Sequence, residues 1–255
     1  MKIYDGQTFT TPLDLRGVEN VLFTRCEFTG DTGDKEGMLE IRGCANMTID
    51  YCYFHDLVGR GNGIVLGSTG GGSINTRIRR SLFENLPGNA IIPKVGNYGT
   101  WIDYNTIRNA GDDDRHHGIY MQAPDGLIEH NDIEGSKGNG ISIRSSGIVR
   151  SNRIAGTAKS AIRYFSDGMP GPSNELIIEK NYCNGSGEGY AVISLLESVG
   201  VGQLVEKYII RHNTLMPYNE KPFDMSQAFK SKTVEYYGNK IGTRQAVRCD
   251  GGMDG

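Results

Sequence analysis

A short sequence pattern recurs along almost the whole chain of 255 residues, and it limits the folds that the chain can adopt. One half of the repeat reads Gly-Ile-x-Φ, where Φ is apolar, and the other half reads Ile-x-x-Asn-x-Ile. Equivalent asparagines are 26 residues apart at Asn105 and Asn131, and 21 residues apart at Asn131 and Asn152. Such units are too short for globular subdomains, and they are too rich in β-branched residues and glycine for helical repeats.

Both halves of the repeat occur nine times. The first half lies at residues 38–43, 62–68, 89–95, 117–123, 139–145, 160–166, 190–196, 221–227 and 245–251. The second half lies at residues 20–28, 46–54, 75–83, 99–107, 125–133, 146–154, 174–182, 206–214 and 233–241. Short strands separated by Gly, Asn and Ser turns are typical of a parallel β-helix, whose coils stack about 4.8 Å apart. The sequence therefore predicts an all-β solenoid of about nine coils, with residues 1–255 forming a single domain.

One column of the repeat contains asparagine in most coils, at Asn105, Asn131, Asn152, Asn181, Asn213 and Asn239. Cys26, Cys52 and Ser81 occupy this column in the early coils. Asparagine tolerates left-handed backbone, and its amide can bond both to the backbone and to another asparagine. The column therefore predicts a bend at which the side chains of successive coils bond to one another.

The repeat, which covers nearly the whole chain, resembles that of the right-handed parallel β-helix superfamily, which includes pectate-lyase-like and C5-epimerase-like repeat proteins. The resemblance implies a single-stranded right-handed helix. It also implies that a carbohydrate binds in a groove across the outward faces of one set of strands.

The composition excludes several classes of partner. The 27 Lys and Arg residues nearly balance 30 Asp and Glu residues, so the net charge is −3 and strong attraction to nucleic acid is not expected. No apolar run is long enough to cross a membrane, and the first residues lack the apolar core of a signal peptide. We therefore expect neither a nucleic-acid partner nor a membrane partner. The compartment is left open, with extracellular and virion-associated locations both retained.

The cysteines indicate buried, reduced thiols. They are odd in number and contain no Cys-x-x-Cys pair, which argues against a zinc site. The five are Cys26, Cys44, Cys52, Cys183 and Cys249.

The repeat is interrupted most clearly between Ile107 and Ile119. Twelve positions separate these two isoleucines, whereas the equivalent step from Phe83 to Ile91 takes eight, and the excess is the segment GDDDRH. Long connections also follow the first strand type, at residues 67–75, 166–174 and 196–207. Insertions in a solenoid form loops on one face. Loops at both ends of the Gly-Ile-x-Φ strands would therefore wall a groove across their outward faces.

Alternation along the strands predicts the floor of this groove. If Ile91, Ile119, Ile141 and Ile162 point inward, the residues next to them and two positions further on point outward. The outward set in the central coils contains Lys94, Tyr120, Gln122, Arg144, Arg163 and Phe165.

Four residues of the central coils are predicted to be catalytic. His116 has no equivalent in the repeat, and an imidazole titrates near neutrality, as a general acid or base requires. His117 occupies the turn position of Asn62, Asn89 and Asn139, so a turn role and a functional role are both open. Tyr120 and Arg144 complete the set, because a tyrosine beside an arginine can transfer a proton.

Five further residues are predicted to bind substrate: Lys94, Gln122, Arg163, Phe165 and Asp167. Arginine suits bidentate recognition of carboxylates, so two arginines and a lysine on one face indicate an acidic sugar. Asp112, Asp113 and Asp114 form a charged turn that could bind Ca²⁺ or supply a carboxylate pair. No cofactor is required by these residues.

Three functions remain open from the sequence. The first is a lyase or C5-epimerase acting on a uronic-acid polysaccharide by abstracting the proton next to the carboxylate. The segment DDDRHHG resembles the Asp- and His-bearing loop of C5-epimerase-like proteins, which implies roles for Asp114 and His116. The second is a polygalacturonase-like glycoside hydrolase. The third is a non-catalytic glycan-binding, tailspike or adhesin β-helix, and as for other solenoids with open ends, a trimer or an end-to-end dimer is expected.

Overall fold

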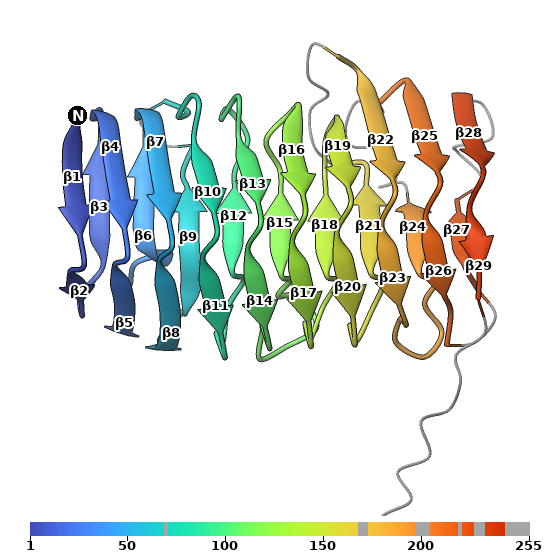
Figure 1. The fold of residues 1–255 in the computed structure, drawn as a ribbon, viewed down its shortest axis with the longest axis horizontal. Helices are drawn as coiled ribbons and strands as arrows, with labels where there is room; N and C mark the ends of the chain where they lie inside the picture. Colours follow the sequence, from blue (N-terminus) through green and yellow to red (C-terminus); the bar gives the residue numbers. More distant parts are fainter. Residues whose placement is uncertain (69–70, 168–172, 197–204, 219–220, 227–232, 243–255) are drawn as a thin grey trace, which may run out of the picture.

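A computed structural model of the chain describes residues 1–68, 71–167, 173–196, 205–218, 221–226 and 233–242. All strands in this part of the chain are parallel to their neighbours, and they form three long sheets that wind around one axis (Figure 1). Nine complete coils of three strands are followed by two strands of a tenth, as the sequence predicts. Within these ranges there is no helix that could cross a membrane. The last copy of the repeat, residues 245–251, lies outside the described residues.

The first sheet, which we call sheet A, carries the first strand of every coil. Its strands are β1 (Lys2–Asp5), β4 (Glu19–Thr24), β7 (Ala45–Asp50), β10 (Arg77–Arg79), β13 (Trp101–Asp103), β16 (Gly126–Glu129), β19 (Gly147–Arg150), β22 (Glu175–Glu179), β25 (Lys207–Arg211) and β28 (Thr233–Tyr237).

Sheet B follows after the bend at the asparagine column. It contains β2 (Thr8–Phe9), β5 (Glu27–Asp31), β8 (Tyr53–Val58), β11 (Leu82–Glu84), β14 (Thr106–Arg108), β17 (Asp132–Glu134), β20 (Arg153–Ala155), β23 (Tyr182–Asn184), β26 (Thr214–Met216) and β29 (Lys240–Ile241).

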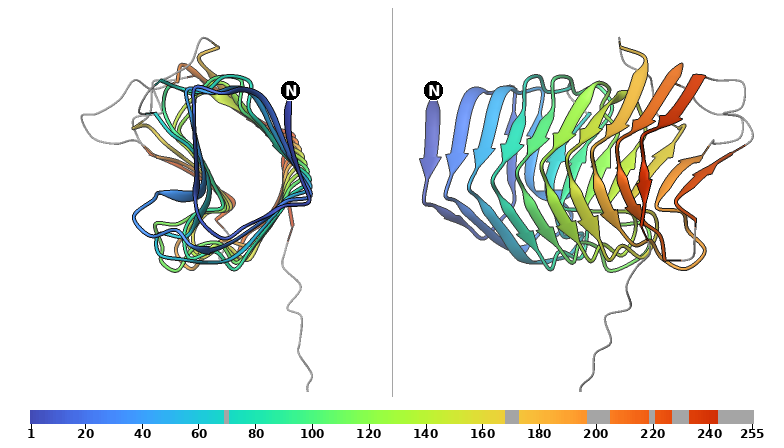
Figure 2. Two further views of the ribbon diagram at one scale, coloured as in Figure 1. Left: turned by 90° about the vertical axis from the view of Figure 1, so that its left-hand side faces the viewer. Right: turned by 45° about the vertical axis from the view of Figure 1, so that its right-hand side comes forward.

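Sheet C corresponds to the Gly-Ile-x-Φ half of the repeat. It contains β3 (Leu13–Arg16), β6 (Gly37–Arg42), β9 (Asn62–Leu66), β12 (Ile91–Pro93), β15 (Ile119–Met121), β18 (Ile141–Ile143), β21 (Ile162–Phe165), β24 (Ile193–Leu196) and β27 (Phe223–Met225). In the view down the axis, the connection from β5 to β6 projects beyond the outline of the coils (Figure 2). Residues 69–70, 168–172 and 197–204 of the predicted groove walls lie outside the described residues.

The core is a set of ladders that run along the axis. Ile119, Ile141 and Ile162 are register partners on neighbouring coils and are fully buried, which confirms the predicted inward set. Near the N-terminal end the ladder is aromatic, and the rings of Phe28 and Phe54 stack with centroids 4.4 Å apart. The four cysteines in the described ranges are buried and free, as expected, whereas Cys249 lies outside those ranges.

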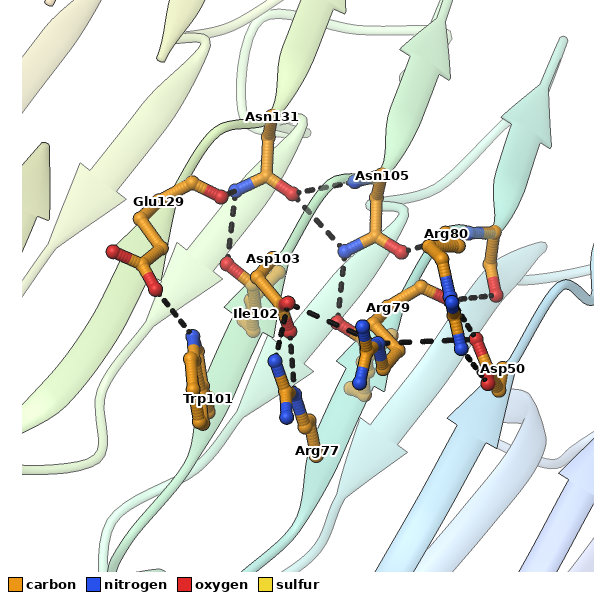
Figure 3. Close-up of polar contacts among 12 residues, drawn as sticks. Asp50, Arg77, Arg79, Arg80, Trp101, Ile102, Asp103, Asn105, Glu129 and Asn131 are labelled. Atoms are coloured by element: carbon orange, nitrogen blue, oxygen red, sulfur yellow. Dashed lines mark hydrogen bonds and ion pairs between the residues drawn. The ribbon is translucent and has the colours of Figure 1, made fainter. Parts of the chain in front are cut away.

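The predicted asparagine bond ladder is present. The Asn131 amide nitrogen donates to Oδ1 of Asn152 at 3.0 Å, and the backbone N–H of Asn131 donates to the same oxygen at 2.9 Å. The same pair of bonds links Asn105 to Asn131 (Figure 3). Each Nδ2 atom also donates to a backbone carbonyl of the preceding coil, as from Asn152 to Ile128 at 3.0 Å. These side chains therefore satisfy backbone groups that the bend removes from the sheets.

Candidate active site

A pocket of about 330 Å³ opens on the outer face of sheet C, over the central coils. Its lining comes from β15 and β21, from the turns that precede β15, β18 and β21, and from Arg144 directly after β18. The lining residues are Asp114, Arg115, His117, Tyr120, Asn139, Arg144, Lys159, Arg163 and Phe165.

The strand register explains why a hollow forms here. Tyr120, Ser142 and Arg163 are outward-facing register partners on three successive coils. The middle residue is small, and Ser142 is fully buried beneath its larger neighbours. The outward orientation of Tyr120 and Arg163 agrees with the alternation in the sequence.

Cationic side chains dominate the pocket. Arg144 donates from Nη1 to Oδ2 of Asp167 at 2.7 Å, and the Nζ atom of Lys159 lies 2.8 Å from a carboxylate oxygen of Asp114. Among the described residues, Arg163 forms no ion pair and no side-chain hydrogen bond, and its Nε atom is buried. Burial and the nearby Arg144 guanidinium lower the pKa of Arg163. The pocket therefore contains a partly desolvated positive charge that no described carboxylate balances.

The ring of Phe165 supports both arginines. The guanidinium carbon of Arg144 lies 4.9 Å from the centre of this ring, and that of Arg163 lies 5.4 Å from it. Arg144 also lies 4.9 Å from the ring centre of Tyr120. Aromatic faces attract cations, so these rings hold the two guanidinium groups close together despite their repulsion.

His117 is the buried histidine of the pocket, with 5% of its surface exposed. Burial, together with Arg144, Lys159 and Arg163, lowers its pKa from 6.5 to about 3. The imidazole is therefore neutral throughout the ordinary working range of pH.

Acidification is expected to destabilise the protein through His117. Because its pKa is lower in the folded state, the stabilisation is complete above pH 6.5 and is lost as the pH falls from 6.5 towards 3. The loss between pH 7.5 and pH 5 is about 2 kcal/mol. Urea unfolding at both pH values, for the wild type and for His117→Asn, isolates this contribution. An equal drop in both proteins would contradict the assignment.

His116 lies outside the pocket lining. Its Nδ1 atom is 2.8 Å from Oδ1 of Asp112 and 3.3 Å from Oδ1 of Asp113. Hydrogen bonds from Arg115 lower the pKa of Asp113 to about 2. A catalytic role for His116 stays a prediction, because the side chain points to this acidic turn.

The three aspartates of the turn have different partners. Asp114 pairs with Lys159 at the pocket, whereas oxygens of Asp112 and Asp113 lie within 4.8 Å of one another and of the His116 nitrogen. Bonds within the turn already engage these groups, so calcium binding stays a prediction.

The other predicted substrate-binding residues lie apart from the pocket lining. Lys94 forms an ion pair with Glu36 at 2.7 Å, and Gln122 is half-buried on the same face. Asp167 reaches the pocket through Arg144. Substrate contacts by Lys94 and Gln122 stay predictions.

Sequence reasoning missed three pocket residues, Arg115, Asn139 and Lys159. Asn139 follows His117 in the turn ladder, and Lys159 stands two coils after His116 in the equivalent turn position. The prediction that His116 has no equivalent in the repeat is therefore wrong. Lys159 could have been found from the sequence, because it occupies the same column of the repeat as His116, which was already a candidate.

Comparison with known proteins identifies the fold family. The family model described as right-handed beta helix region matches residues 62–199, more than half of the chain. No curated protein sequence matches. Two solved structures are similar: a T265N mutant of the periplasmic alginate epimerase AlgG, at 12% identity and a TM-score of 0.63, and the Dettilon tailspike protein gp208, at 14% and 0.55.

The two alignments cover 87% and 88% of this chain but only 50% and 49% of those structures, so the chain spans about half of their length. At these identities the likeness concerns the fold. With three parallel sheets, an asparagine ladder and a matching family model, the chain belongs to the right-handed β-helix family.

Proposed function

We propose that the protein binds an acidic polysaccharide on sheet C and abstracts the proton next to a uronic-acid carboxylate, as a lyase or a C5-epimerase. The observation that carries this proposal is the charge of Arg163, whose buried Nε atom has no partner among the residues that the structure describes. Burying an unpaired charge is costly. An anionic ligand would remove that cost.

The reaction needs the charge that the pocket supplies. When the C5–H bond breaks, its electron pair moves into the adjacent carboxylate, which gains a second negative charge. Arg163 and Arg144 can stabilise that charge, and electrostatic stabilisation of this kind usually contributes more to catalysis than any other single effect. In a lyase the C4–O4 bond then breaks to give a C4=C5 double bond and a protonated O4. In an epimerase a proton returns to C5 from the opposite face.

The candidates for proton transfer are Tyr120 and His117 in the pocket, and His116 at the neighbouring turn. Similarity in fold to an alginate epimerase is compatible with this chemistry, and similarity to a tailspike is compatible with binding alone. Fold similarity does not distinguish catalysis from binding alone, so the test must measure whether the C5–H bond breaks.

The test is incubation with a panel of uronic-acid polymers in deuterated water. We expect deuterium at C5 for either reaction, detected by NMR, and an ultraviolet-absorbing unsaturated product for a lyase. A neutral polysaccharide of similar length serves as the control. New reducing ends without either signal would indicate hydrolysis, and binding without any reaction would indicate a glycan-binding protein; both results would overturn the proposal.

A further inference from the structure

A second, shorter ladder runs along the turn that precedes sheet C, and His117 is one of its members. Asn62 and Asn89 form its first step, in which the backbone N–H of Asn89 donates to Oδ1 of Asn62 at 2.7 Å. In the next step the backbone N–H of His117 donates to Oδ1 of Asn89, also at 2.7 Å. The backbone N–H of Asn139 then donates to Nδ1 of His117 at 3.0 Å. The imidazole therefore replaces an asparagine amide as the acceptor for the following coil.

This contact fixes the tautomer of His117. A backbone N–H can only donate, so Nδ1 must present its lone pair and the ring proton must lie on Nε2. The side-chain nitrogen of Asn139, 3.5 Å away, faces the same lone pair. If Nδ1 carried a proton, this N–H would face the backbone N–H of Asn139, and neither group could accept a hydrogen bond from the other.

The surroundings keep the ring neutral and in place. Arg144, Lys159, Arg163 and His116 all oppose protonation, and the ring is buried. A Cβ atom at Gly138 would lie 2.4 Å from Nδ1, so the glycine provides the space that the ring occupies.

The bonds of the ladder leave the Nε2 atom of His117 available to a ligand in the pocket. His117 lines the pocket and meets the Tyr120 ring edge-on, with centroids 5.3 Å apart and planes at 77°. No described residue forms a hydrogen bond with Nε2. A neutral N–H group on a residue that lines a cationic pocket can donate to a carboxylate, but it has no lone pair with which to accept a proton.

We infer that the ladder holds His117 as a neutral Nε2–H donor to the substrate carboxylate, and that Tyr120 is the group that removes the proton from C5. This inference rests on the proposed function and assigns roles within it. Asn89 and Asn139 are positioning residues, because they act through His117. In the reaction Tyr120 first gives its phenolic proton to solvent, and its oxygen then takes the C5 proton. The electron pair of the C5–H bond enters the carboxylate, and no bond at His117 forms or breaks.

Elimination among the pocket residues supports the role of Tyr120. Asp114 is paired with Lys159, and the arginines have no basic lone pair at working pH. The hydroxyl of Tyr120 forms no hydrogen bond with any described residue, so it is the ionisable group that remains open to a ligand.

The first test needs no substrate. Nitrogen-15 NMR of the His117 ring, assigned by comparison with His117→Asn, is expected to show a lone-pair nitrogen at Nδ1 and a protonated nitrogen at Nε2 between pH 5 and pH 8. The opposite tautomer, or a ring that titrates within this range, would overturn the inference. The result is independent of whether the protein acts on any polysaccharide.

The second test compares two variants of His117. One keeps the acceptor for the ladder, and the other keeps the donor for the pocket. His117→Asn retains the ladder acceptor that neighbouring coils use and loses the pocket donor. His117→Gln places an amide N–H near the Nε2 position and disturbs the ladder. We expect the asparagine variant to be the more stable but to lose about 10²-fold in the rate of C5 exchange, as for other single donors to a developing anion.

The glutamine variant is expected to be less stable but to retain at least about tenfold more activity than the asparagine variant. Tyr120→Phe is expected to lose exchange while still binding the polymer, and the remaining activity of His117→Asn should keep the wild-type pH profile. Equal inactivity of both His117 variants, with a changed pH profile in the asparagine variant, would show that His117 is the base. Absence of exchange in the wild type, with the NMR result as expected, would refute the proposed function and leave the tautomer assignment intact.

Discussion

Replacing Arg163 with methionine is expected to lower polyuronate turnover by at least about two orders of magnitude while leaving the fold as stable as the wild type or more so. The side chain is a partly buried cation that pairs with no carboxylate in the described part of the chain, and its Nε atom is fully enclosed. An apolar side chain of similar length removes that desolvation cost, so we expect a gain in stability of about 1 kcal/mol. The same change removes the charge that would stabilise the doubly negative intermediate, which is expected to lower kcat/KM about 10²- to 10³-fold.

Arg153→Met is a matched control for this experiment. Arg153 lies on sheet B, pairs with Asp132 at 2.7 Å, and is half exposed. Its loss should leave turnover unchanged and cost less than about 1 kcal/mol of stability. Thermal unfolding and C5 exchange are measured for both variants. If Arg163→Met lost several kcal/mol of stability, the cation would have a structural partner and the pocket would not be a free anion site.

Replacing Asn152 with alanine is expected to destabilise the protein by about 4 kcal/mol. Its Oδ1 accepts the backbone N–H and the side-chain amide of Asn131, at 2.9 and 3.0 Å. Its Nδ2 donates to the carbonyls of Ile128 and Arg150, each at 3.0 Å. Alanine would remove the acceptor of the buried Asn131 backbone N–H, and a buried unsatisfied group costs about 1–3 kcal/mol. It would also remove three further bonds, although the Asn131 amide keeps the carbonyls of Ile102 and Glu129, and the Arg150 carbonyl keeps the His130 N–H. Urea unfolding measures the loss.

Two companion variants make the experiment specific. Asn152→Ser should recover part of the loss, because Ser81 stands in the same column and its hydroxyl accepts the backbone N–H of Cys52 at 3.0 Å. Asn109→Ala removes an exposed bond to Asn85 at 2.9 Å and should cost only about 1 kcal/mol. A loss at Asn152 no greater than at Asn109 would contradict a stabilising role for the buried ladder.

The strands and bends that repeat in every coil could be predicted from the sequence, because each follows from a short local pattern. Inward Ile119 and outward Tyr120 follow from alternation, and the asparagine column could be recognised because one residue type repeats at equivalent bends. The family, the parallel strands and the direction of Arg163 followed from the same repeat.

The turns were harder to predict, because a turn residue has no period that fixes its direction. His116, which follows the three aspartates, points to Asp112, whereas its neighbour His117 reaches the pocket. The pairing of Lys94 with Glu36 joins residues 58 positions apart through two side chains of the outer face. Such contacts depend on rotamers and loop paths that the strand pattern does not determine.

The spacing of the ladders also determines how the groove across sheet C can change in length. Asn139 and Ser160 hold equivalent places in the second ladder, so the chain between them is one complete turn of the solenoid. Losing or duplicating such a turn would leave every remaining coil with a neighbour of the same backbone shape. It would also alter the separation of Tyr120 and Arg163 by one strand spacing, about 4.8 Å. The groove can therefore be lengthened or shortened in whole steps, without redesign of the core beneath it.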